Sequence, residues 1–185
     1  MTLSDVGQLA ASDDAEPALQ MDEDAFRLFY EQTARAIWVY LARMSGDDRL
    51  ADDLLQETYV RFLRARASFA SDDHRRNYLF RIATNLVRDH RRRARVAPIV
   101  VEQVPPAEGA VDAATADRVA SHIDVSRALA RLKPRERSLL WLAYAEGLSH
   151  AEIASALGLR TGSLKALLHR ARRRLHRLLG SEVAP

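Results

Sequence analysis

Apolar residues in the first half of the chain recur every three or four positions, which is the spacing of one face of an α-helix. Polar breaks at residues 45–47 and 68–73 divide the pattern into three runs. The runs are Phe26, Phe29, Tyr30, Ile37, Trp38, Leu41 and Met44, then Leu50, Leu54, Tyr59, Phe62 and Leu63, then Tyr78, Leu79, Ile82, Leu86 and Val87. Three amphipathic helices are therefore predicted within residues 24–95.

The helical pattern stops between residues 96 and 120, where prolines, a glycine, alanines and acids predominate. Such a segment breaks helices and has little apolar surface to bury, so it predicts a flexible linker. Helical periodicity then resumes through Val125, Leu129 and Leu132, and Pro134 suits the first turn of a further helix. No segment alternates as a strand does. The expected fold is all-α, with two small helical domains at residues 24–95 and 121–180.

The formal net charge is only +3, but the charged residues are distributed unevenly along the chain. Residues 1–26 hold seven acids and no Lys or Arg, which leaves 28 basic residues against 18 acids, a formal charge of +10, in the rest of the chain. Residues 1–23 are predicted to be a disordered acidic leader; a self-masking arm against the basic helices is the alternative. The remainder is strongly basic, as in proteins that bind polyanions.

Two stretches carry most of this positive charge. Residues 75–95 contain eight arginines against one acid, Asp89, and residues 160–177 contain seven basic residues and no acid. Such charge density repels itself unless a polyanion is the intended neighbour, so two DNA-binding helices are predicted, one in each domain.

The second basic stretch belongs to a helix-turn-helix pattern. Ser149 and Glu152 form an S-x-x-E capping box that opens a short helix, and Gly158 ends it. A longer helix follows. Its apolar stripe begins at Leu164 and Leu168 and continues at helical spacing towards the end of the helix. A helical hairpin with a solvated charged face is the alternative. DNA recognition is favoured because no acids stand at helical spacing to neutralise the charge.

Other classes of function lack the residues they require. The chain has no cysteine, and its six histidines have no metal-ligand spacing, so neither a metal nor a cofactor is expected. A nucleic-acid enzyme lacks support because no carboxylate cluster accompanies the basic stretches. No apolar run reaches the ~20 residues of a membrane span, and the start does not resemble a signal peptide. A cytoplasmic protein without membrane insertion is expected.

Three sequence blocks together carry a resemblance to a known family. The first is DLLQETYVR at residues 53–61, and the second is NYLFRIATNLVRD at residues 77–89. The third comprises LKPRER at 132–137, EGLS at 146–149, EIA at 152–154, GSLK at 162–165 and HRAR at 169–172. In this order the blocks resemble the extracytoplasmic-function (group 4) sigma factors of the sigma-70 family. The resemblance implies that the first domain binds core RNA polymerase and opens the minus-ten promoter element. It implies that the second domain reads the minus-thirty-five element.

The resemblance also implies the site residues. Core polymerase would be bound by Asp53, Gln56, Glu57 and Arg61, although the residues alone favour an ordinary solvated face there. The minus-ten element would be contacted by Arg75, Arg76, Asn77, Tyr78, Arg81, Asn85, Arg88, Arg91 and Arg92. The minus-thirty-five element would be contacted by Arg160, Thr161, Ser163, Lys165, His169, Arg170, Arg172 and Arg173.

Core RNA polymerase and promoter DNA are thus the expected partners, with an anti-sigma factor implied by the resemblance alone. The alternative is a two-domain helix-turn-helix regulator that acts without docking on the polymerase. The chain departs from the family pattern in having Tyr78 where tryptophan is frequent, and Leu167 where a polar residue is frequent.

Overall fold

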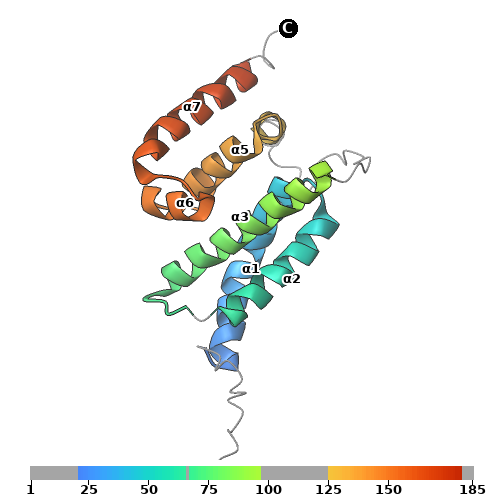
Figure 1. The fold of residues 1–185 in the computed structure, drawn as a ribbon, viewed down its shortest axis with the longest axis vertical. Coiled ribbons are helices and arrows are strands. Elements are labelled where there is room, and N and C mark those ends of the chain that lie inside the picture. Colours follow the sequence, from blue (N-terminus) through green and yellow to red (C-terminus); the bar gives the residue numbers. More distant parts are fainter. Residues whose placement is uncertain (1–20, 66, 97–124, 181–185) are drawn as a thin grey trace, which may run out of the picture.

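The computed structural model describes residues 21–65, 67–96 and 125–180; most of the predicted leader and most of the predicted linker lie outside them. The N-terminal domain consists of α1 (Glu23–Ser45), α2 (Asp48–Arg64) and α3 (Asp72–Val96). The C-terminal domain begins with helical residues 125–130. It continues with α5 (Pro134–Leu140), a π-helix η1 (Trp141–Ala145), α6 (His150–Leu157) and α7 (Thr161–Gly180). Figure 1 shows this arrangement, and the described residues contain no strand, as the sequence predicts.

The breaks between the first helices come from their capping residues. The Asp22 carboxylate accepts a hydrogen bond from the Ala25 amide at 2.7 Å, which satisfies one free amide at the start of α1. Gly46 ends α1 with φ of +80°, and the Asp47 carboxylate then caps α2 through the amides of Arg49 and Leu50. The predicted break at residues 45–47 is confirmed.

Aromatic side chains dominate the core of the N-terminal domain. Phe29 stacks on Phe62 with ring centroids 5.4 Å apart, and Tyr40 meets Phe80 edge to face at 5.5 Å. The buried Tyr40 hydroxyl shares a hydrogen bond of 2.8 Å with the hydroxyl of Thr84, a residue of α3. Burial raises the pKa of Tyr59 to about 12. This core fixes α3 against both α1 and α2.

The helices of the C-terminal domain begin and end where the sequence predicts, with one addition. Pro134 occupies the first turn of α5, and the Ser149–Glu152 capping box and Gly158, with φ of +63°, bound α6 as expected. The sequence predicts ordinary helix after α5, but residues 141–145 form a π-helix. A π-helix is closed by i to i+5 hydrogen bonds, such as that from the Glu146 amide to the Trp141 carbonyl at 3.2 Å.

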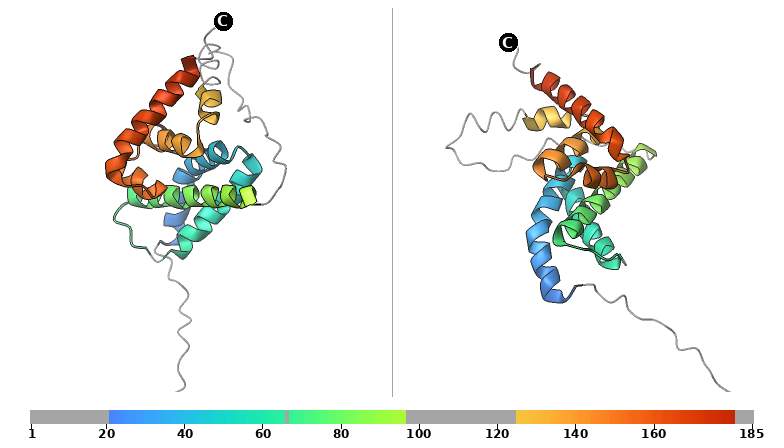
Figure 2. Two further views of the ribbon diagram at one scale, coloured as in Figure 1. Left: turned by 45° about the horizontal axis from the view of Figure 1, so that its top comes forward. Right: turned by 90° about the vertical axis from the view of Figure 1, so that its left-hand side faces the viewer.

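The two domains lie in direct contact. Helix α3 packs against α6 across the boundary, and α1 contacts α5. Figures 1 and 2 show α3 between the other two N-terminal helices and the C-terminal domain. Buried residues of both domains form one continuous apolar cluster. The two helical domains therefore pack against each other in this structure.

Candidate nucleic-acid interface

Helices α6 and α7 form the predicted helix-turn-helix. Leu164, Leu168 and Ala171 bury the inner face of α7, and Gly158 supplies the left-handed residue of the turn. Helix α7 begins at Thr161, directly after Arg160. The apolar stripe predicted from the sequence thus faces the domain core and leaves the opposite face of α7 free.

The outward face of α7 carries the residues predicted to contact the minus-thirty-five element. All eight are exposed: Arg160, Thr161, Ser163, Lys165, His169, Arg170, Arg172 and Arg173. The Arg172 guanidinium donates to the Tyr144 hydroxyl at 3.2 Å, and Tyr144 is 61% exposed. A neighbouring arginine outside the predicted set, Arg174, pairs with Glu136 at 3.6 Å. The surface is cationic and open to an anionic ligand.

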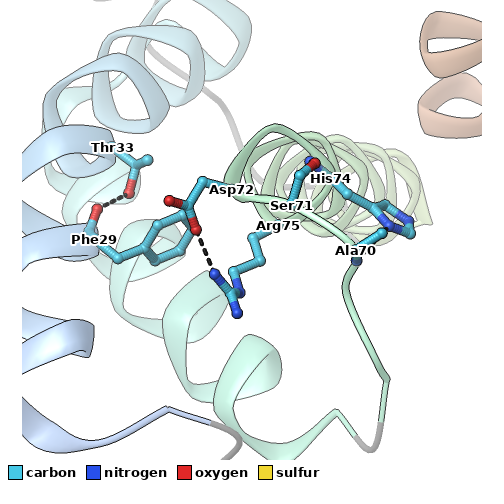
Figure 3. A network of polar contacts seen from close by, with 7 residues as sticks. All are labelled: Phe29, Thr33, Ala70, Ser71, Asp72, His74 and Arg75. Atoms are coloured by element: carbon cyan, nitrogen blue, oxygen red, sulfur yellow. Dashed lines mark hydrogen bonds and ion pairs between the residues drawn. The ribbon is translucent and has the colours of Figure 1, made fainter.

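The loop before α3 is held by polar contacts shown in Figure 3, which also draws the bond from the Thr33 hydroxyl to the Phe29 carbonyl within α1. The His74 amide donates to the Ser71 hydroxyl at 3.2 Å, which caps the first turn of α3. The Arg75 guanidinium donates to the Asp72 carboxylate. The first arginine of the predicted minus-ten set is thus paired within its own helix.

An aromatic platform supports the next part of α3. Tyr78 lies against Phe69 with ring centroids 5.1 Å apart, and Phe69 stacks on Phe62 at 5.5 Å. The Arg81 guanidinium lies over the Tyr78 ring at 4.5 Å from its centroid, a cation–π geometry. Tyr78 is half-buried, as expected for a residue that serves partly as core. A planar cation on an aromatic ring is a surface on which an unpaired base can stack.

Two half-buried residues of the predicted minus-ten set contact the C-terminal domain. The Arg76 guanidinium pairs with the Glu146 carboxylate at 2.6 Å. The Asn77 amide donates to the Glu152 carboxylate. Sequence reasoning did not select the two acids as site residues, because nothing in their local pattern indicates a partner about 70 residues away.

The remaining residues of the predicted set differ in their surroundings. Arg88 is exposed and Asn85 is half-buried. Arg92 pairs with Asp89 at 3.8 Å, as the helical spacing predicts. Arg91 donates to the backbone carbonyl of Met44 at the end of α1.

A second arginine reaches the same end of α1 from the other domain. The Arg137 guanidinium donates to the Arg43 carbonyl at 3.0 Å and to the Ala130 carbonyl. Cations at a helix C-terminus interact favourably with its free carbonyls. Burial, and to a lesser degree the charge of Arg91, lower the pKa of Arg137. Its Nε is buried without a hydrogen-bond partner among the described residues.

The predicted polymerase-docking residues share the outward face of α2. Asp53 and Gln56 are exposed. Arg61 donates from Nε to Glu57 at 2.6 Å, with roughly half of each side chain exposed. These four residues share one polar side of α2, and the side opposite to it carries the buried residues Ala51, Thr58 and Phe62.

Other types of site find little support in the described part of the chain. No group of His, Cys, Asp or Glu residues there could hold a metal ion. Among the same residues, no helix combines the length and apolar character that membrane crossing requires.

Comparison with known proteins identifies the class to which this architecture belongs. Residues 29–96 match the family model "Sigma-70 region 2", and residues 122–175 match "Sigma-70, region 4". The chain therefore belongs to the sigma-70 family. Its relatives and its two-domain helical fold place it among the extracytoplasmic-function sigma factors, which direct RNA polymerase to promoters.

Relatives and solved structures extend over most of the chain. It is 34% identical over 154 residues to "ECF RNA polymerase sigma factor SigL" of Mycobacterium tuberculosis, covering 80% of this chain and 85% of that protein. It is 31% identical to "ECF RNA polymerase sigma factor SigC" of the same species, covering 88% and 90%. The structure of CnrH in complex with the cytosolic domain of CnrY aligns with a TM-score of 0.61 and 26% identity, covering 86% and 90%. The fold also matches the RpoE–NepR structure from Bartonella quintana, with a TM-score of 0.62, 23% identity and coverage of 86% and 98%.

Proposed function

We propose that the two basic helices divide promoter recognition between them. Helix α7 enters the major groove of the minus-thirty-five element, with Arg160, Ser163 and Lys165 near base edges and the later arginines on phosphates. The observation that supports this most directly is that the whole predicted contact face of α7 is exposed and cationic above a buried apolar stripe.

Helix α3 captures the non-template strand of the minus-ten element once the duplex opens. Flipped or unpaired bases need a stacking surface and a cationic groove. The Arg81–Tyr78 stack supplies the first, and Asn85 and Arg88 line the helix beyond it. The protein contributes binding energy for opening rather than catalytic chemistry, because RNA synthesis belongs to the polymerase. It acts in the cytoplasm, where core polymerase and promoter DNA are found.

Core polymerase docks on the α2 face defined by Asp53, Gln56, Glu57 and Arg61. The supporting observation is that these polar residues are presented together and none is needed for the domain core. An anti-sigma factor is a further proposed partner, since a protein of similar fold, the sigma factor RpoE, was solved in complex with the anti-sigma factor NepR. A regulator that does not dock on the polymerase is not favoured, because the family matches include region 2 as well as region 4.

The docking face can be tested with purified core polymerase. Replacing Asp53, Gln56 and Glu57 with alanine should weaken binding to core polymerase at least about tenfold without unfolding the domain, because truncating exposed residues costs little stability. The control variant carries Glu31→Ala and Gln32→Ala, which remove exposed polar side chains from α1. Unchanged core affinity in the α2 variant would refute this docking surface.

A further inference from the structure

At the domain boundary, Arg76 of α3, a predicted DNA contact, pairs with Glu146, a nearly buried acid that directly follows η1. Arg76 and Glu146 meet at 2.6 Å, and the Glu146 side chain is only 7% exposed. The Arg76 guanidinium also lies over the Phe80 ring, 5.4 Å from its centroid. Partial burial strengthens the Coulombic attraction between the two charges, and the desolvation cost of burial opposes it. Removing one partner would leave the other charge unpaired at the domain boundary. This pair joins the two domains.

The π-helix positions Glu146 for this contact. The Trp141 indole N–H donates to one Glu146 carboxylate oxygen at 2.9 Å, while Arg76 donates to the other at 2.6 Å. Both oxygens are therefore satisfied, which a buried carboxylate requires. The extra residue of the π-turn brings Trp141 and Glu146 to the same side of the helix, where the Trp141 indole holds this carboxylate in place.

A second contact uses the capping residue of the helix-turn-helix. One Glu152 oxygen accepts from the Ser149 amide at 2.7 Å and so caps α6, while the other accepts from the Asn77 amide. Arg76 and Asn77 are adjacent on α3, and both are predicted to contact minus-ten DNA. The atoms that would bind DNA phosphates or base edges are thus occupied by two carboxylates of the C-terminal domain.

We infer that the free protein is autoinhibited by this contact between Arg76, Asn77, Glu146 and Glu152, which we call the α3–α6 contact. Glu146 and Glu152 occupy the anion-binding positions of α3 until core polymerase and DNA displace them. The inference rests on the proposed role of Arg76 and Asn77 in minus-ten recognition. Helix α7 stays exposed in the closed arrangement, so only strand capture is blocked.

The boundary between the domains also contains a feature that favours their separation. Arg137 and Arg91 place two guanidinium groups at the end of α1, and the Arg137 Nε has no partner among the described residues. Separation of the domains would return Arg137 to water and relieve both the charge repulsion and the unpaired donor. The closed state is thus a balance of opposing contacts, which allows a binding partner to reverse it.

The first test measures the distance between the domains in the free protein. Because the chain has no cysteine, nitroxide labels can be placed at Glu31→Cys on α1 and His176→Cys on α7. Double electron–electron resonance should give a single short distance between the two labels in the parent protein. Combining Glu146→Gln with Glu152→Gln should shift the closed-to-open ratio at least about tenfold and add a broad, longer population. Glutamine still accepts from Trp141 and still completes a capping box, so folding is retained.

The matched control is Glu136→Gln, which weakens the pair with Arg174 inside the C-terminal domain and leaves the boundary untouched. It should not change the distance. An unchanged distance in the double glutamine variant, with circular dichroism showing a folded protein, would overturn the inference. So would a broad distance distribution in the parent, because the closed state would then not dominate.

The second test measures open-complex formation at limiting sigma factor, on a promoter selected from random DNA by the reconstituted holoenzyme. The double glutamine variant should form more open complex than the parent, by several-fold, and the difference should vanish at saturating sigma factor. Equal activity at every concentration would show that the contact is not inhibitory. If Arg76→Ala or Asn77→Ala left opening intact, the proposed minus-ten role would fail, while the distance measurement would still stand.

Discussion

The two basic helices of this sigma factor have similar charge densities in sequence but different surroundings. In α3, arginines are matched by Asp72, Glu146, Asp89 and the Met44 carbonyl. In α7, the eight predicted contact residues are all exposed. A run of arginines therefore reveals an affinity for anions, but it does not reveal whether DNA or the protein itself provides them.

The difference follows from where each helix packs. Helix α3 is the inner helix of its domain, with α1 and α2 on its apolar side and α6 on part of its polar side. Helix α7 packs on α5 and α6 and leaves a broad face open. The strand capture proposed for α3 therefore needs a conformational change, whereas the duplex binding proposed for α7 does not.

The largest expected effect of a substitution on DNA affinity is in α7. Replacing Arg170, Arg172 and Arg173 with glutamine should weaken binding to upstream duplex DNA about a hundredfold at ~0.1 M salt, across all sequences, because each phosphate contact releases counterions. The slope of log affinity against log salt should fall by about one for each phosphate that is no longer neutralised. Fluorescence anisotropy over a salt series measures both. An unchanged slope would mean that these arginines do not touch phosphates.

A smaller, sequence-dependent effect is expected at the other end of the same helix. Ser163→Ala or Lys165→Ala should reduce discrimination between the preferred upstream sequence and its single-base variants by about tenfold, as removal of a base contact does. Affinity for unrelated DNA should change much less. Selection from a randomised duplex library reads out the preference. If these two substitutions and the arginine variant changed sequence discrimination equally, the N-terminal end of α7 would not be the part inserted in the major groove.

The smallest expected effect is that of a substitution in the turn before α7, which should change stability without changing DNA binding. Gly158→Ala places a side chain at φ of +63°, while space around the residue is ample, so backbone strain alone should cost about 1 kcal/mol of unfolding free energy. Below the melting transition, DNA affinity of α7 should be unchanged. Chemical denaturation and anisotropy on the same sample test this. A large loss of affinity in folded protein would show that the turn geometry, rather than the surface charge alone, controls α7.

Local sequence signals predicted most of the fold. Caps and breakers such as Asp47, Ser149 and Gly158 act on neighbouring residues, so their effect can be read from a few positions. The capping box and the apolar stripe of α7 were both confirmed for that reason. The π-helix was missed because its hydrophobic pattern differs little from that of an α-helix over five residues.

Long-range contacts could not be predicted in the same way. Arg76 and Glu146 stand 70 residues apart, on either side of the predicted linker, and nothing near either residue indicates the other. Arg91 reads as one more member of an arginine run, yet in the structure it binds the end of α1. Charge patterns predicted two DNA-binding helices, whereas only the tertiary arrangement shows which of their residues contact other parts of the protein.

The division of labour between α3 and α7 is tested most directly on one promoter with two footprints. Asn77→Ala, Arg81→Ala and Asn85→Ala together should preserve nuclease protection of the minus-thirty-five element and abolish permanganate reactivity of unpaired thymines at the minus-ten element. The α7 arginine variant is the matched control, in which upstream protection disappears first. Asn77→Ala also weakens the α3–α6 contact between the domains. A loss of promoter opening in this variant therefore cannot result from a more stable closed arrangement of the protein. Normal permanganate reactivity in the α3 variant, or loss of both footprints together, would contradict the account.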